Sequence, residues 1–195
     1  MTALRPDLAL IADNVAPGSR VLDVGCGDGE LLAALREKGC DSRGMEIDPH
    51  NVAECVARGL SVIQGDADMD LQFYPDKSFD YAILSQTLQT TMRPDKVLDE
   101  LLRIGRKAVV SFPNFAHWRV RMSLLWSGRM PVTRLLPVAW YETPNIHHLT
   151  IADFRAHLKE RGIAVEGAWF LKGDRLTSAA AANFRAEHAV FLIAR

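Results

Sequence analysis

Three carboxylates are the residues best suited to chemistry, because each lies at or just after the end of a stretch of strand type: Asp23, Glu46 and Asp66. Asp23 also stands two residues before three glycines at alternate positions, Gly25, Gly27 and Gly29. A glycine turn carries no Cβ atoms, so a ligand can approach its backbone closely. Carboxylates beside such a turn attract a cation and repel a phosphate. The pattern predicts a site for a positively charged ligand without phosphate groups.

The glycine spacing separates this turn from a dinucleotide fingerprint. G-x-G-x-x-G would place its third glycine at position 30, where the chain has Glu30. Asp28 adds a further carboxylate inside the turn. S-adenosylmethionine (SAM) carries a sulfonium and an ammonium group but no phosphate. Leu-Asp-Val followed by G-x-G-x-G resembles the first motif of class I SAM-dependent methyltransferases. A glycine turn that serves only packing is the alternative.

We expect SAM, or its product S-adenosylhomocysteine (SAH), to contact the ends of the first four strands. Glu46 lies at the end of the second strand, where its carboxylate can accept both ribose hydroxyls; a surface role is the alternative. Asp66 ends the third strand and can accept from an adenine amino group, or serve only an Asx turn. The predicted cofactor-binding residues are Asp23, Gly25, Cys26, Gly27, Gly29, Glu46, Ile47, Asp66, Ala67 and Ser85.

Strand patterns alternate with helical patterns along the chain. Strands are predicted at 21–24, 41–47, 60–64, 79–84, 107–112, 163–171 and 189–194. A helix is predicted at 6–15, as a lid over the cleft or a cover for the sheet, and later helices end at Gly39, Gly59, Gly105 and Gly162. This alternation predicts an α/β fold with a doubly wound, mostly parallel sheet. The methyltransferase resemblance implies seven strands, of which the last is antiparallel.

The composition is that of a single globular domain covering residues 1–195. Apolar residues make up 48% and charged residues 24% of the chain. We find no signal-peptide pattern and no apolar stretch long enough for a membrane span. The three cysteines, Cys26, Cys40 and Cys55, form no C-x-x-C motif. They indicate reduced thiols in a cytoplasmic protein rather than a disulfide frame or a zinc site.

A segment at about 113–149 interrupts the alternation of strands and helices. From Leu101 to Tyr141 there are seven Lys/Arg and no Asp/Glu, and the region holds Trp118, Trp126 and Trp140. The mixture fits a surface for a protein partner, an internal cap whose tryptophans are core, or, least favoured, a nucleic-acid surface. Four leucines of this segment need burial in any of these cases: Leu124, Leu125, Leu135 and Leu136.

Five stretches together resemble the methionine biosynthesis family MetW: 20–32, 44–49, 112–121, 128–132 and 140–147. The last three are the more specific, and His148 is a local departure where an aromatic residue is expected. The resemblance implies a class I methyltransferase fold that supports a homoserine O-acyltransferase in methionine biosynthesis. We therefore expect that enzyme to be the partner of segment 113–149.

Whether the protein transfers a methyl group is left open by the sequence. The stretch Ser85-Gln86-Thr87-Leu88 lacks the prolines and the aromatic residue that many amino-methylating enzymes of this fold have there. Four side chains are possible bases without a defined position: Tyr81, His117, Tyr141 and His147. No catalytic residue is therefore assigned, and the pair His147-His148 lacks a third metal ligand. A SAM-dependent methyltransferase acting on a small molecule is the alternative function, and an RNA methyltransferase is a weaker one.

Overall fold

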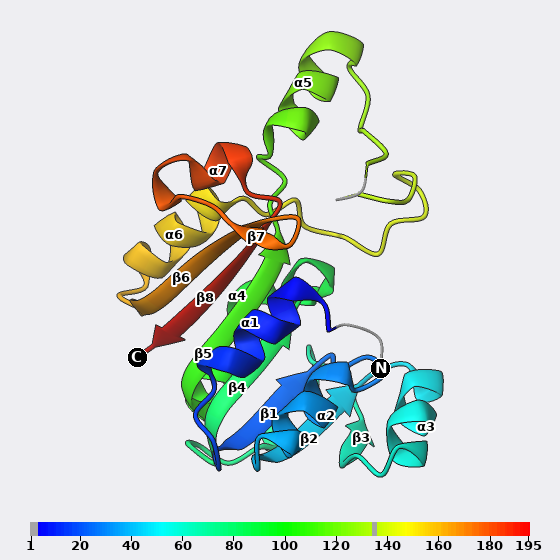
Figure 1. Ribbon diagram of the computed structural model, residues 1–195, viewed down its shortest axis with the longest axis vertical. Helices are drawn as coiled ribbons and strands as arrows, with labels where there is room; N and C mark the ends of the chain where they lie inside the picture. Colours follow the sequence, from blue (N-terminus) through cyan, green and yellow to red (C-terminus); the bar gives the residue numbers. More distant parts are fainter. Residues whose placement is uncertain (1–3, 134–135) are drawn as a thin grey trace.

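A computed structural model describes residues 4–133 and 136–195 of the chain, so Leu135 lies outside the described residues. The strands form one sheet in the order β3-β2-β1-β4-β5-β8-β6-β7 (Figure 1). Their bounds are β1 Arg20–Val24, β2 Asp41–Glu46, β3 Val62–Gln64, β4 Phe79–Ser85, β5 Gly105–Pro113, β6 Ala164–Lys172, β7 Arg175–Leu176 and β8 His188–Ala194. The first five strands pair in parallel, and β8 is antiparallel to both β5 and β6.

The predicted doubly wound, mostly parallel sheet is confirmed, with one addition. All seven predicted strands are present, and the two-residue strand β7 extends the sheet at the β6 edge. The chain between β6 and β8 also contains the short helix α7, Ala182–Arg185. The order of the first four strands brings the carboxyl ends of β1, β2, β3 and β4 to one edge of the sheet.

The remaining helices are α1 Pro6–Asn14, α2 Glu30–Glu37, α3 Pro49–Ala57, α4 Pro94–Ile104, α5 Trp118–Ser127 and α6 Ile151–Glu160. Alternate strand residues divide between two apolar layers because successive side chains point to opposite faces of a sheet. Val21, Ile83 and Val109 pack with α1 and α2 on one face. Leu22, Ala82 and similar residues pack with α4 and α6 on the other. Helices therefore cover both faces, as the sequence predicts.

Two of the helices begin at a side-chain cap. The carboxylate of Asp48 accepts the backbone N–H of His50 at 2.8 Å at the start of α3. The hydroxyl of Thr150 accepts the N–H of Asp153 at 3.1 Å at the start of α6. The capping role of Asp48 leaves Glu46 as the carboxylate available to a ligand at the end of β2.

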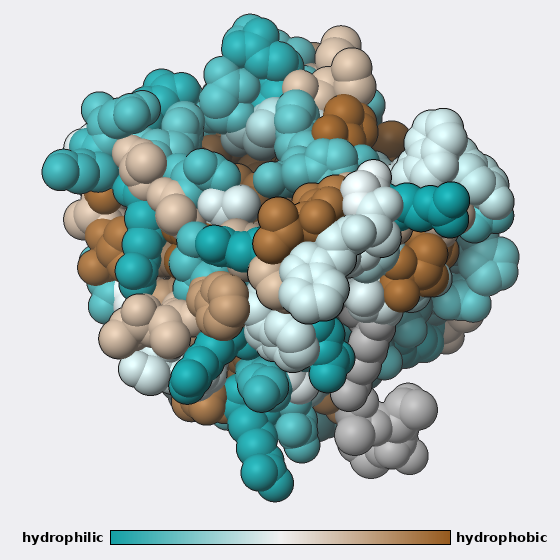
Figure 2. Space-filling view, turned by 90° about the horizontal axis from the view of Figure 1, so that it is seen from above, coloured by the Kyte–Doolittle hydropathy of each residue, from teal (hydrophilic) through white to brown (hydrophobic). Residues whose placement is uncertain are grey.

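Helix α5 and the chain that returns to α6 form an arm, residues 118–149, which rises above the sheet in Figure 1. A small cluster of Phe115, Val120 and Leu136 anchors it. By contrast Leu125 is 73% exposed, Trp126 83% and Trp140 75%. The internal cap with core tryptophans is therefore wrong for Trp126 and Trp140, because both lie in solvent. Figure 2 looks down on this end of the molecule and shows hydrophobic side chains among polar ones.

Candidate functional site

The three glycines after β1 have left-handed backbone angles, with φ of 71° at Gly25, 57° at Gly27 and 81° at Gly29. A Cβ at Gly25 would lie 2.5 Å from Oγ1 of Thr87, and one at Gly29 would lie 2.5 Å from Cδ1 of Leu60. Nothing lies within 4 Å of a Cβ at Gly27. Two glycines thus let the loop pack against the protein, while the middle one presents bare backbone to open space.

Glu46 lies beside this loop, as the sequence predicts. Its Oε2 accepts the N–H of Gly27 at 2.7 Å, and its Oε1 accepts the N–H groups of Ile47 and Asp48 at 3.0 Å each. The side chain is buried, so these bonds fix the carboxylate against the glycine turn. A carboxylate oxygen has two lone pairs, which leaves Oε2 with capacity for a further donor such as a hydroxyl.

Asp23 is the buried carboxylate at the end of β1. It is 2% exposed, and its Oδ1 has no hydrogen-bond partner among the described residues. Burial raises the pKa of Asp23 to about 7; the charge of Arg5 opposes the rise and that of Glu46 adds to it. An unpartnered buried carboxylate is costly. A nearby cation would lower that cost, so the residues present fit a cationic ligand.

Of the other predicted cofactor contacts, one side chain is exposed and the rest already contact protein groups. Ile47 is 62% exposed and directly follows Glu46. Asp66 is half-buried, and its Oδ1 accepts the N–H of Asp68 at 2.9 Å, which is the Asx-turn arrangement. Cys26, within the loop, is buried in a small cluster with Leu32 and Cys55, and Ala67 packs against the core. The cofactor roles of these residues stay predictions.

Ser85 belongs to a buried polar network that the sequence did not reveal. Its hydroxyl donates to Oδ2 of Asp7 at 3.2 Å and accepts from Nη2 of Arg5 at 3.1 Å. Ser111 donates to the same Oδ2 at 3.2 Å. Burial by itself raises the pKa of Asp7, but Arg5, Gln86 and His188 outweigh it and hold that pKa below its usual value. The hydroxyl of Ser85 is thus engaged within the protein, and its predicted cofactor contact stays untested.

Gln86 follows Ser85 at the end of β4 and has a φ of 52°. Left-handed angles are strained for residues other than glycine, and such strain clusters at functional sites. Nε2 of Gln86 donates to Oδ2 of Asp7 at 3.1 Å, and its backbone N–H donates to the carbonyl of Ser111 at 2.9 Å. Sequence reasoning missed Asp7; the only signal was an acid in the first turn of the opening helix.

The candidate bases are scattered. Tyr141 is 71% exposed on the arm. His117 is buried before α5, where burial lowers its pKa, and its Nε2 has no partner among the described residues. His147 likewise has an unpartnered Nε2. None of the three has a hydrogen bond to the glycine loop in the described part of the chain. The part of the chain described also holds no group of His, Cys, Asp or Glu arranged to bind a metal ion.

The family model described as methionine biosynthesis protein MetW matches residues 5–193. The chain belongs to the MetW family. A similar curated relative is the bifunctional methionine biosynthesis protein MetXA/MetW of Rhodopirellula baltica, 35% identical over 98% of this chain. The chain covers 33% of the length of that relative. It is also 29% identical to the ubiquinone biosynthesis O-methyltransferase of Xylella fastidiosa, over 76% of this chain and 62% of that protein.

Solved structures similar to this MetW-family chain share its fold. A SAM-dependent methyltransferase from Mesorhizobium loti matches with a TM-score of 0.71 at 19% identity, covering 97% of this chain and 96% of that one. Magnesium protoporphyrin IX methyltransferase from Synechocystis with bound SAH matches with a TM-score of 0.67 at 18% identity, over 97% and 80% of the two chains. The fold is therefore that of class I SAM-dependent methyltransferases. None of the helices in residues 4–133 and 136–195 has the length and hydropathy that crossing a bilayer requires.

Proposed function

We propose that this MetW-family protein binds SAM at the ends of β1 to β3 and acts as an accessory subunit that activates homoserine O-acyltransferase. The observation that carries the proposal is the relative from Rhodopirellula baltica, whose name joins MetXA and MetW in one bifunctional protein. The family resemblance implies that the partner is the homoserine O-acyltransferase. In that relative, one chain carries both proteins and therefore holds them close together. We infer that the corresponding separate proteins also associate physically.

The cofactor part of the proposal is supported by the geometry of the glycine loop. Gly27 presents bare backbone, Glu46 is fixed beside it, and Asp23 holds an unpartnered buried carboxylate oxygen. A sulfonium and an ammonium group would stabilise the ionised form of that carboxylate. A dinucleotide would bring two negative phosphates to the same place, where the carboxylates repel them. Bound SAH in a structure of the same fold is consistent with this cofactor.

The partner part is supported by the arm, residues 118–149. Leu124, Leu125 and Trp126 are all exposed at the end of α5. Contiguous exposed apolar side chains beside polar ones are typical of protein interaction sites. Arg119 and Arg129 lie in the same arm, and arginine with tryptophan is the mixture favoured at interface hot spots. We therefore place the acyltransferase contact on α5.

Purified homoserine O-acyltransferase provides the test, assayed alone and with this protein, with and without SAM. We expect the two proteins to co-elute and the rate of acyl transfer to rise on mixing. Leu125→Asp, on the arm, should abolish both effects. Val56→Asp, a change at a residue 59% exposed on α3, should leave both intact. Absence of co-elution together with an unchanged rate would refute the accessory role.

A methyltransferase acting on a small molecule is the second candidate. It is favoured by the strained backbone of Gln86 at the end of β4, next to Thr87, which packs against Gly25. Incubating the protein and labelled SAM with a cell extract should then label a small molecule. A Gly27→Ala variant serves as the control, because its methyl group fills the open space at the turn. Label transfer by that variant at the wild-type rate would count against the site.

A further inference from the structure

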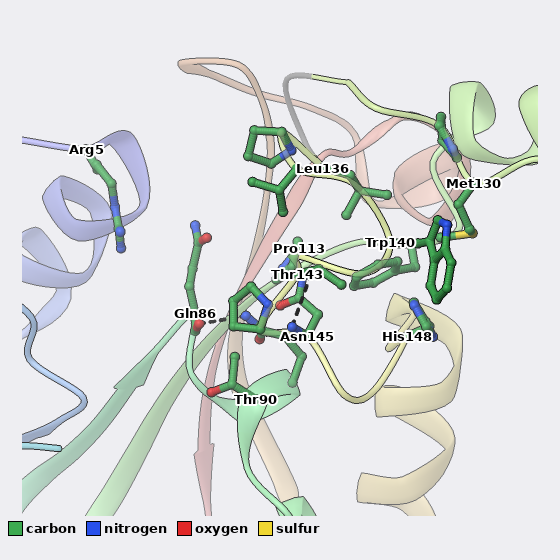
Figure 3. Close-up of a pocket in the computed structure, with 16 residues that line it drawn as sticks. Arg5, Gln86, Thr90, Pro113, Met130, Leu136, Trp140, Thr143, Asn145 and His148 are labelled. Carbon is green, nitrogen blue, oxygen red and sulfur yellow. Dashed lines mark hydrogen bonds between the residues drawn. The ribbon is translucent and has the colours of Figure 1, made fainter. Parts of the chain in front are cut away.

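A cavity lies between the ends of β4 and β5 and the arm. It has a volume of about 640 Å³, within the usual range for small-molecule sites. Figure 3 shows Gln86, Thr90 and Pro113 on its sheet side and Leu136, Trp140 and Asn145 on its arm side. The lining is mostly apolar, and Phe115 and His148 meet edge to face with ring centroids 4.9 Å apart. These lining side chains suit a ligand with a flat or extended apolar group.

The polar groups of the cavity are one guanidinium, a histidine, and several side-chain amides and hydroxyls; the buried Oε1 of Gln89 is an acceptor with no partner among the described residues. Among the described lining residues, only Arg5 and His148 have basic side chains, and none has a carboxylate. Asp7 pairs with Nε and Nη2 of Arg5 at 3.3 Å each, but it lines the neighbouring pocket instead. Nη1 of Arg5 has no hydrogen-bond partner in residues 4–133 and 136–195. One guanidinium edge is therefore left for an acceptor.

Two further groups on the arm side add donor capacity. The hydroxyl of Thr143 accepts the N–H of Asn145 at 3.2 Å, which leaves its own hydrogen free to donate. The indole N–H of Trp140 makes no hydrogen bond to any described residue, and this side chain is 75% exposed. A ligand with oxygen acceptors gains from these groups. An ammonium group would meet Arg5 and gain no carboxylate partner.

We propose that this cavity binds a small organic acid, with an apolar or aromatic body against Phe115 and Trp140 and an anionic head toward Arg5. The site adjoins the proposed cofactor site, because Gln86 lines the cavity and Thr87 packs against Gly25. The acid would thus occupy the position of a methyl acceptor or of an effector beside SAM. The proposal rests neither on SAM binding nor on the acyltransferase contact, so it can fail or hold independently of both.

The test uses anilinonaphthalene sulfonate, an anionic dye whose fluorescence rises in apolar sites, with the full-length protein. Bound dye is displaced with 3-phenylpropionate or with 3-phenylpropan-1-ol, which share the apolar body and differ in the charged head. A charge-assisted hydrogen bond from Arg5 should make the acid effective at about ten-fold lower concentration than the alcohol. In Arg5→Gln this preference should disappear. Equal potency of acid and alcohol on the wild-type protein would overturn the proposal.

Two matched variants locate the dye. Val138→Trp places an indole in the cavity and should reduce bound-dye fluorescence several-fold, whereas Trp126→Ala removes an 83% exposed residue on α5 that does not line it. Retained dye binding in Val138→Trp, or its loss in Trp126→Ala alone, would assign the dye to the arm surface and refute the cavity site. Near-ultraviolet circular dichroism of each variant confirms that a folded protein is compared. SAM affinity, measured in parallel, separates failure here from failure of the cofactor site.

Discussion

Asp23 places an ionisable group in the protein interior with no hydrogen-bond partner for Oδ1 among the described residues. Because its pKa in the folded protein is about 7, well above the ordinary 3.8, the folded state keeps a proton that the unfolded state has already lost. Protonation of Asp23 therefore stabilises the ligand-free protein, and this contribution is lost as the pH rises from about 4 through about 7. SAM, as a cation, favours the ionised carboxylate instead.

SAM affinity should consequently increase with pH. Below about pH 7, binding must first remove the proton from Asp23, and above it the carboxylate is already ionised. We expect the dissociation constant to fall between about pH 6 and pH 8 and then level off. Calorimetric titrations with SAM across this range measure the effect. The Asp23→Asn variant should bind more weakly and without this pH dependence; a wild-type affinity that is flat with pH would contradict the role of Asp23.

A substitution at Gly27 can distinguish the cost of backbone strain from the loss of ligand contact. An alanine at this position costs roughly 1–2 kcal/mol for the left-handed angle but meets no protein atom. Gly39→Ala is the matched control, since Gly39 has a φ of 78°, has equally open space and ends α2. We expect similar losses of thermal stability in the two variants. SAH affinity should fall by about ten-fold or more in Gly27→Ala and stay unchanged in Gly39→Ala.

Equal SAH affinity in both variants would show that the middle glycine does not face the ligand.

Among the single residues, position along the strands made Glu46 predictable, because a carboxylate that ends β2 must lie beside the turn after β1. Asp7 and Gln86 were not predictable in the same way. Their roles depend on how the start of α1 meets the end of β4, a contact between residues 79 positions apart.

Among the elements, α5 differs from the other long helices because nearly all of its large apolar residues are exposed. Of its residues Val120 is buried, whereas Leu125 and Trp126 are exposed. We expect Leu125→Asp and Trp126→Asp to leave the melting temperature within about one degree of wild type, as surface changes do. Val120→Asp should lower it by many degrees, because it buries an unpaired charge. A large loss of stability in Trp126→Asp would show that this tryptophan packs within the protein after all.

Helix α5 was not predicted from the sequence, unlike the helices that pack on the sheet. The helices that pack on the sheet have an apolar stripe and, in α2, α3 and α6, an end at a left-handed glycine; both patterns can be read from the sequence. Helix α5 lacks a one-sided stripe because Val120 is its only buried residue, so the region was expected only as an insertion. Strand β7 was missed because two residues give no detectable alternation.

On the scale of the whole molecule, charge is strongly segregated along the chain. Residues 1–100 carry 9 Lys/Arg and 18 Asp/Glu, a net charge of −9, and residues 101–195 carry 14 and 6, a net charge of +8. The acidic half contains the glycine loop and the basic half contains the arm. The overall fold was predictable because the strand and helix patterns alternate. The placement of the arm was not, since among the described residues only the small cluster of Phe115, Val120 and Leu136 anchors it.

The basic arm should make association with the acyltransferase depend on salt. Raising the salt from about 0.1 M to about 1 M shortens the Debye length from about 10 Å to about 3 Å and should weaken the complex. Replacing the exposed Arg119 and Arg129 with glutamine should weaken it at low salt and flatten the salt dependence. Analytical ultracentrifugation of the mixed proteins measures both effects. An affinity independent of salt would limit the role of the arm to its apolar residues.

The central claim is that the strand ends form a site for a cationic nucleoside without phosphates, and isothermal titration calorimetry tests it most directly. We expect SAM to bind with one-to-one stoichiometry and NAD⁺ not to bind. Glu46→Gln should weaken SAM binding by about ten-fold or more, since charge-assisted hydrogen bonds contribute about 1.5–3 kcal/mol. Glu54→Gln, on the exposed surface of α3, should not. Binding of NAD⁺, or unchanged SAM affinity in Glu46→Gln, would contradict the account.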